Sequence, residues 1–317
     1  MNQIIISGIA FSIPLLSLAL SGIFSERSGV TNLAVEGFQG VGAFIGAFIA
    51  VILQTKMSGN VPYYVALLTA FVGGCIYALL HAVLCIKFKA DQVVSGVVIN
   101  IFAMALTAYL TKRANIAIFN QNSDKMVLNI APRVTVPGIS KIPVIGAFFT
   151  NVYTFIPIII VAVFIGWFVM YKTRFGMYLR ACGDNPQSVD AAGVDVAKIR
   201  YIAVMLGGGF AGLGGISYAY SISSNFSSNI YSGYGYLAIA ALIFGNWNIL
   251  PTVGACLLFG FARSAGYQIV MMAELPSAYQ DLIMILPYVL TLFVLLFYSK
   301  KNHAPRALGQ PYDKGER

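Results

Sequence analysis

Three observations on this sequence predict an all-α, polytopic integral membrane protein that forms a single domain. Of its 317 residues, 58% are hydrophobic and 10% are charged, whereas a soluble globular domain carries about 25% charged residues. Apolar blocks recur along the chain, many of them close to the roughly 20 residues with which a helix crosses a bilayer. The basic residues stand mainly between these blocks. Because backbone groups inside a bilayer must be hydrogen-bonded within their own segment, each block is expected to be a helix.

Charge-free blocks mark the expected spans in chain order. We expect nine spans, with a range of eight to ten, over residues 4–24, 37–53, 62–86, 93–110, 152–170, 201–222, 234–244, 251–270 and 282–298. The seventh block is short and glycine-rich, which predicts a broken or re-entrant helix. All spans are expected to belong to one transmembrane domain, residues 1–317, without a water-soluble domain.

The positive charge of the chain predicts its orientation. The loop 172–200 and the tail 299–317 are both rich in Lys and Arg, so both are predicted to be cytoplasmic. Counting spans backwards then places the loop 112–151 and the N-terminus outside the cytoplasm. That outer loop is also basic, but long loops follow the charge rule less strictly than short ones. The net charge of +9 is therefore read as membrane topology and not as a nucleic-acid surface.

Signatures of catalysis are missing from the sequence. It contains no phosphate-binding Gly-x-x-x-x-Gly-Lys-Ser/Thr loop, no His-Glu-x-x-His pair and no Gly-x-Ser-x-Gly elbow. The cysteines show no Cys-x-x-Cys spacing and are expected to be unpaired apolar residues; they are Cys75, Cys85, Cys182 and Cys256. We therefore expect no enzyme activity, metal or cofactor on this chain, and any ATP must be bound by another subunit.

Glycine is concentrated in the second and sixth predicted spans. Small residues let helix backbones approach closely, and they also permit unwinding along a transport pathway. Gly207, Gly208 and Gly209 follow one another, and each Gly lowers helix propensity by about 1 kcal/mol relative to Ala. The triplet predicts a hinge or a break.

Three polar residues near or within apolar spans are candidates for the substrate pathway. Asn32 and Glu36 would share one face of a helix, and an ionisable group at the membrane marks an interior-facing site by default. The alternative is that Glu36 only stabilises the start of its own helix through the helix dipole. Asn100, in the middle of an apolar span, is either a hydrogen-bonding group between helices or a pathway group. His81 is expected to be a buried histidine with satisfied hydrogen bonds.

The loop 172–200 predicts a short cytoplasmic helix. Asp184, Asn185 and Pro186 form a helix start, with a capping residue followed by Pro in the first turn. The helix is expected over residues 187–192 and to end at Gly193. Such a helix between two spans suits the groove of a soluble partner, or else it lies inertly on the membrane surface.

At this loop the chain resembles a known family. FGMYLRACGDNPQSVDAAGV is similar to the coupling loop of permeases in bacterial ATP-binding-cassette (ABC) importers for simple sugars, nucleosides and branched-chain amino acids. SERSGVTNLAVEGFQGVGAFIGA resembles the family's E-R-x-G-V-x-N-x-x-x-E-G signature, and DQVVSGVVIN and GYGYLAIAALIFG resemble further segments. The nucleoside branch is the nearest in pattern. Gln39, Gly40 and Pro251 depart from the family pattern, which bears on the substrate and not on the family.

The resemblance implies a multi-pass protein of the bacterial plasma membrane that works in a complex. Its partners would be a second, often non-identical permease, cytosolic ATPase subunits carrying ATP and Mg, and an extracytoplasmic substrate-binding lipoprotein. The residues expected to couple to the ATPase are Arg180, Gly183, Asp184, Asn185, Pro186, Ala191, Ala192 and Gly193. The alternatives are a permease for simple sugars or other small solutes, an ion-driven secondary transporter, and a purely structural membrane subunit.

Overall fold

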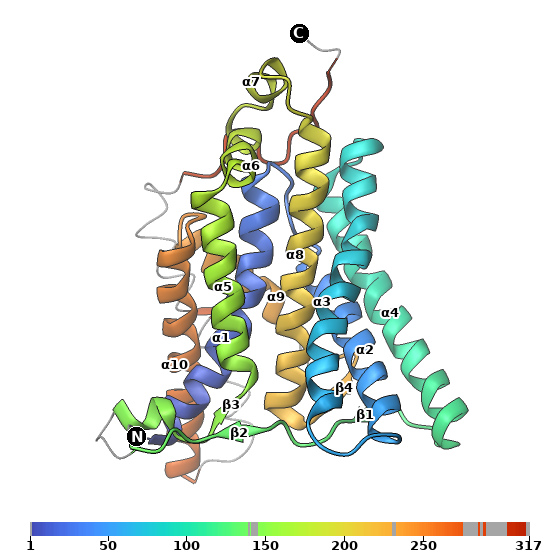
Figure 1. The fold of residues 1–317 in the computed structure, drawn as a ribbon, viewed down its shortest axis with the longest axis vertical. Helices are drawn as coiled ribbons and strands as arrows, with labels where there is room; N and C mark the ends of the chain where they lie inside the picture. The colour runs from blue at the N-terminus through green and yellow to red at the C-terminus, as the bar shows by residue number, and fades with distance from the viewer. Residues whose placement is uncertain are drawn as a thin grey trace.

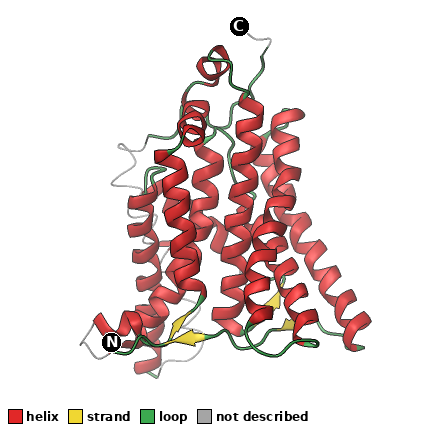
Figure 2. Cartoon of the chain, viewed as in Figure 1, coloured by secondary structure: helices red, strands yellow, loops and turns green. Residues whose placement is uncertain are grey.

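The computed structural model describes residues 2–138, 140, 145–229, 233–274, 285, 288–289 and 303–314. Helices dominate this part of the chain, and the few short strands gather at one end of the bundle (Figure 2). The helices are α1 (Asn2–Arg27), α2 (Val35–Gln54), α3 (Val61–Ala82), α4 (Gln92–Phe119), α5 (Phe155–Lys172), α6 (Arg174–Asp184), α7 (Pro186–Ala191), α8 (Val196–Tyr218), α9 (Tyr234–Phe244) and α10 (Ile249–Met272). Short π-helical turns, Val83–Lys87 and Ala219–Ser223, extend α3 and α8.

Within the described residues, seven helices are long and apolar enough to cross a membrane. They are α1, α2, α3, α4, α5, α8 and α10, and they coincide with seven of the predicted spans. One further helix, α9, is apolar but has only 11 residues, as expected for the short seventh block. The predicted last span, 282–298, lies almost wholly outside the described residues, so the count of nine stays a prediction.

Helix α8 lies at the centre of the bundle and packs against α1, α2 and α3. It is a continuous helix through Gly207, Gly208 and Gly209, so the predicted break at this triplet is wrong, while the hinge stays a prediction. The physical reason is close packing: a Cβ on Gly208 would collide with the backbone of Gly74 in α3, and one on Gly207 would approach the carbonyl oxygen of Ser21 in α1. Here glycine allows neighbouring helix backbones to touch.

The two ends of the bundle carry different segments (Figure 1). At one end lie the N-terminus and two antiparallel strand pairs. The pairs join β1 (Lys125–Val127) to β4 (Asn225–Ser227) and β2 (Arg133–Val134) to β3 (Val152–Tyr153). At the other end lie α6, α7 and the C-terminus. Because α4 continues to Phe119, the segment predicted to be the outer loop begins several residues later than the expected 112.

The flanks of the bundle expose apolar side chains. On α4, Val94 and Ile101 are 61% and 60% exposed, and on α5 Phe164 and Ile165 are 62% and 54% exposed. Many exposed large apolar side chains of this kind are unfavourable in water. They are expected where a helix contacts lipid or another membrane subunit.

Candidate functional site

Glu36 lies in the first turn of α2 and points across to the N-terminus of α9. Its carboxylate accepts a hydrogen bond from the backbone N–H of Gly233, and the backbone amides of Gly235 and Tyr236 are also within its hydrogen-bonding reach. Gly233 precedes α9 in a left-handed conformation, with φ of 95°. A negative charge at a helix N-terminus is favourable because the free N–H groups and the helix dipole both attract it. Glu36 therefore caps another helix, α9, which neither reading of the sequence anticipated.

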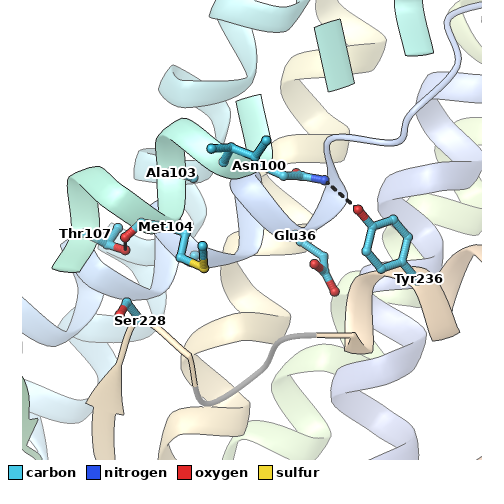
Figure 3. Close-up of a pocket in the computed structure, with 9 residues that line it drawn as sticks. Glu36, Asn100, Ala103, Met104, Thr107, Ser228 and Tyr236 are labelled. Carbon is cyan, nitrogen blue, oxygen red and sulfur yellow. Dashed lines mark hydrogen bonds between the residues drawn. The ribbon is translucent and has the colours of Figure 1, made fainter. Parts of the chain in front are cut away.

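Asn100 connects three helices around the same point. Its Oδ1 accepts a hydrogen bond of 2.7 Å from the N–H of Gly37, next to Glu36. Its Nδ2 donates to the carbonyl of Leu33 at 2.7 Å and to the hydroxyl of Tyr236 at 3.3 Å (Figure 3). Asn100 thus makes the predicted hydrogen bonds between helices, and it does so at the position where Glu36 meets α9.

These residues border a cavity of about 200 Å³ between α2, α4, α9 and the segment after β4. Figure 3 shows the carboxylate, the amide and the phenol gathered on one side, with smaller and apolar side chains opposite. The lining residues are Glu36, Gly40, Asn100, Ile101, Ala103, Met104, Thr107, Ser228 and Tyr236. A carboxylate, an amide and three hydroxyls beside apolar surface suit an uncharged solute that has hydroxyls and an apolar face.

Asn32 is not part of this cavity. It lies in the turn between α1 and α2 and is fully buried, and because α2 begins only at Val35, the predicted face shared with Glu36 does not form. The Nδ2 of Asn32 donates to the Ser21 hydroxyl at 3.1 Å, and its N–H faces Oε1 of Glu26 at 3.4 Å. The Asn32 side chain therefore holds the turn against α1.

The short helix in the loop 172–200 is present as α7, from Pro186 to Ala191. The Asn185 Oδ1 accepts a hydrogen bond of 3.1 Å from the N–H of Ser188, which confirms the predicted cap followed by Pro. The chain leaves the helix at Gly193 with φ of 78°, as predicted for a glycine C-terminal cap. Its boundaries differ from the expected 187–192 by one residue at each end.

The predicted coupling residues divide into two groups. Gly183 and Pro186 are buried, and the guanidinium of Arg180 lies 5.3 Å from the ring centre of Tyr171 at the end of α5. These three hold α6 and α7 to the bundle. The exposed members are Asp184, Asn185, Ala191, Ala192 and Gly193. The structure therefore presents the end of α7, with its two alanines, to the surroundings.

The remaining singled-out residues are structural. All four cysteines are free, as predicted, and burial raises the pKa of the Cys182 thiol to about 11, so this thiol stays protonated and unreactive. The two ring nitrogens of His81 contact the Ser95 hydroxyl at 2.9 Å and the Thr31 carbonyl at 3.0 Å, which confirms a satisfied buried histidine. No cluster of metal-ligating side chains occurs among the residues that the structure describes.

Sequence reasoning missed several residues of the cavity. Tyr236, Thr107 and Ser228 line it. These residue types are common in the sequence, which has 18 Tyr alone, so no single one of them could be chosen as a cavity residue. The one available signal was that Tyr236 lies in the segment GYGYLAIAALIFG.

Comparison with known proteins gives a consistent assignment. The family model described as "Branched-chain amino acid transport system / permease component" matches residues 4–295. The guanosine ABC transporter permease protein NupQ of Bacillus subtilis is 37% identical, over 100% of this chain and 98% of its own length. The nucleoside ABC transporter permease protein NupC of Lactococcus lactis is also 37% identical, over 99% and 98%. The putative glucose ABC transporter permease protein TsgC13 of Haloferax volcanii is 33% identical, over 78% and 71%.

The family match covers most of the chain, and the relatives named as ABC transporter permeases align over their full length or most of it. Together with the apolar helices, this makes the chain a multi-pass protein of the plasma membrane. It belongs to the family of permease components of branched-chain amino acid transport systems.

Proposed function

We propose that this chain is the membrane-spanning permease subunit of an ABC importer and that its solute is a nucleoside. The observation that carries the proposal is the cavity where Glu36, Asn100 and Tyr236 meet at the N-terminus of α9. The full-length similarity to permeases named for guanosine and for nucleosides supports the choice of solute.

The chemistry of the cavity suits the two halves of a nucleoside. The carboxylate of Glu36 accepts hydrogen bonds and the amide of Asn100 both donates and accepts them, as the ribose hydroxyls require. The ring of Tyr236 is 45% exposed and offers an aromatic face to a base, a contact of about 1–3 kcal/mol in single-stranded nucleic-acid complexes. Met104 and Ile101 also line the cavity and supply apolar contact. A second permease subunit completes the path beside the exposed face of α4.

Energy for transport enters through α7. In this proposal a cytosolic ATPase subunit, which binds ATP and Mg, receives the exposed end of α7 at Ala191 and Ala192. Closure of the ATPases then moves α7 and the helices joined to it. This movement opens the pathway alternately to the two sides of the membrane. An extracytoplasmic binding lipoprotein delivers the solute.

The hydrogen bond from Gly233 to Glu36 gives the pathway a movable wall. Helix α9 has 11 residues, too few to span a bilayer alone, and its N-terminus is held by a side chain from α2. Solute hydroxyls and the amides at the start of α9 compete for the same carboxylate. Binding of the solute therefore favours release of α9 from Glu36.

Uptake into vesicles that contain the assembled importer tests the proposed solute. Guanosine uptake should be inhibited by other nucleosides and not by glucose, and Tyr236→Ala should raise the KM for guanosine by about tenfold because it removes one stacking contact. Tyr267→Ala, in the exposed part of α10 away from this cavity, is the control. Uptake that glucose inhibits and that Tyr236→Ala leaves unchanged would favour the simple-sugar alternative.

A further inference from the structure

The described C-terminal segment, residues 303–314, crosses the end of the bundle that carries α6 and α7. Figure 1 shows this red segment passing α6 and the end of α8 on its way to the C-terminus. The N–H of Ala307 donates to the carbonyl of Gly183, at the end of α6, at 2.7 Å, and the N–H of Gly309 donates to the carbonyl of Gly29 at 3.1 Å. Pro305 and Ala307 are buried. The segment is thus bonded both to the loop 172–200 and to the turn after α1.

Arg200 of α8 holds the segment through a hydrogen bond. This arginine of α8 is only 2% exposed. Its Nε donates to the carbonyl of Ser28 at 3.1 Å and its Nη1 donates to the carbonyl of Gln310 at 3.2 Å. A buried guanidinium is unfavourable unless its donors find partners. The tail supplies one of those partners, so Arg200 and the segment 303–314 stabilise each other.

The far end of the segment reaches α7 itself. Lys314 forms an ion pair of 3.2 Å with Asp190 of α7, and Asp313 pairs with Lys89 in the loop before α4. The segment therefore contacts the loop 172–200 at two points, at Gly183 before the short helix and at Asp190 within it.

We propose that residues 303–314 form a strap that positions α7 for contact with the ATPase subunit; this rests on the proposed function. A helix of six residues has little stability of its own, so its position is set by what it contacts. The strap joins α7 to Arg200 and to the turn at Gly29, which leads into α2 and Glu36. A force applied to α7 is thereby carried to the helices that form the pathway.

Substitutions in the assembled importer test the strap. Ala307→Asp places a charge at a buried strap position, and Arg306→Asp places the same residue at the exposed neighbouring position. Ala307→Asp should lower guanosine-stimulated ATP hydrolysis by about tenfold, a common size for coupling between sites. The rate for Arg306→Asp should stay within about twofold of the wild type, as surface substitutions do. Ala307→Ser, which adds no charge, should hydrolyse ATP at close to the wild-type rate.

A deletion of residues 303–317 is the second variant, in case Ala307→Asp prevents folding. The amount of permease in the membrane and the apparent Tm are measured alongside, since a purely structural role lowers both and a positioning role lowers only the stimulated hydrolysis. A strap deletion that leaves guanosine-stimulated hydrolysis at the wild-type level would overturn the proposal, and so would a loss that follows the loss of folded protein.

Ala191→Trp separates this inference from the proposed function, because it blocks the exposed end of α7 without touching the strap. If Ala191→Trp detaches the ATPase while the strap variants behave as wild type, the strap inference fails and the proposed function stands. If neither change affects the ATPase, the coupling role of α7 fails, and the strap inference fails with it. If only the strap variants detach the ATPase, the strap binds the ATPase directly and does not act through α7, which also overturns the inference.

Discussion

At the scale of single residues, the two predicted pathway residues Asn32 and Glu36 lie in different surroundings. Glu36 borders the cavity and caps α9, whereas Asn32 is buried in the turn before α2. The difference comes from where the helix starts. A helix that began four residues earlier would place both side chains on one face.

Glu36→Gln keeps the shape of the side chain and removes its charge. Hydrogen bonds to a charged acceptor are roughly twice as strong as neutral ones, so we expect α9 and the solute to be held less well and guanosine uptake to fall by about tenfold. Uptake and copurification of the partner subunits are measured together. Glu274→Gln, at an exposed carboxylate beyond the end of α10, is the matched control. Normal uptake by Glu36→Gln would mean that the carboxylate has no role in transport.

Asn32→Ala should reduce stability and leave transport intact. It removes the hydrogen bond to Ser21 and opens a small gap at a fully buried position, at an expected cost of about 1–2 kcal/mol in the free energy of unfolding. The measurement is the apparent Tm in detergent together with uptake per folded molecule. A loss of uptake at unchanged Tm would return Asn32 to the pathway.

At the scale of elements, α7 and α8 show what glycine does in two different settings. Gly193 ends α7 with a positive φ, and no atom lies within 4 Å of a Cβ added there. Gly208 has the opposite surroundings, because the backbone of α3 occupies that space. The first position requires a backbone conformation and the second requires an absent side chain.

Gly193→Val should therefore weaken coupling through the backbone alone. A β-branched residue in the left-handed region costs about 1 kcal/mol or more, so the end of α7 loses its position and guanosine-stimulated ATP hydrolysis falls. Gly193→Asn is the matched control, since Asn tolerates this conformation. Equal hydrolysis by the Val and Asn variants would show that the cap does not matter for coupling.

Gly208→Ala should destabilise the bundle, because its new methyl group collides with α3; overpacking of this kind costs about 1–3 kcal/mol. Gly254→Ala in α10 is the comparison, because no atom lies within 4 Å of the added Cβ and the helix gains up to about 1 kcal/mol in propensity. Thermal unfolding in detergent should move in opposite directions for the two variants. A lower Tm for both would contradict packing as the reason for the glycine triplet.

At the scale of the whole molecule, the bundle has few carboxylates with which to bind a coupling ion. Within the described spans Glu26 is buried and accepts a hydrogen bond of 2.6 Å from the indole of Trp247, and Glu36 caps α9. An ion-driven transporter needs ionisable groups along its path that exchange an ion. Glu26 is held by the Trp247 indole, and the Glu36 carboxylate is occupied by the amides of α9 or, in the proposed function, by the solute, so neither is left to exchange an ion.

Transport should therefore depend on ATP and not on an ion gradient. Guanosine uptake into vesicles with the complete importer should stop when ATP is omitted and persist when ionophores remove the proton and sodium gradients. Uptake that continues without ATP while either gradient is maintained would favour the secondary transporter. Purification of the permease without any ATPase partner would instead favour a purely structural subunit.

The sequence by itself determined the features that depend on local composition and spacing. The apolar blocks predicted the seven long apolar helices of the described residues, because burial in lipid requires continuous apolar segments. The cap at Asn185, the following Pro186 and the end at Gly193 predicted α7 to within one residue, because a capped turn is formed by neighbours in the chain.

The tertiary structure decided everything that joins residues distant in sequence. Glu36 meets Gly233, Arg200 meets Gln310, and the glycines of α8 meet the backbone of α3. None of these pairings leaves a periodic signal, since each depends on which helices pack together. For that reason the sequence predicted that Glu36 matters but not that its partner is another helix, and it predicted a hinge or a break at a triplet that the structure shows as continuous, closely packed helix.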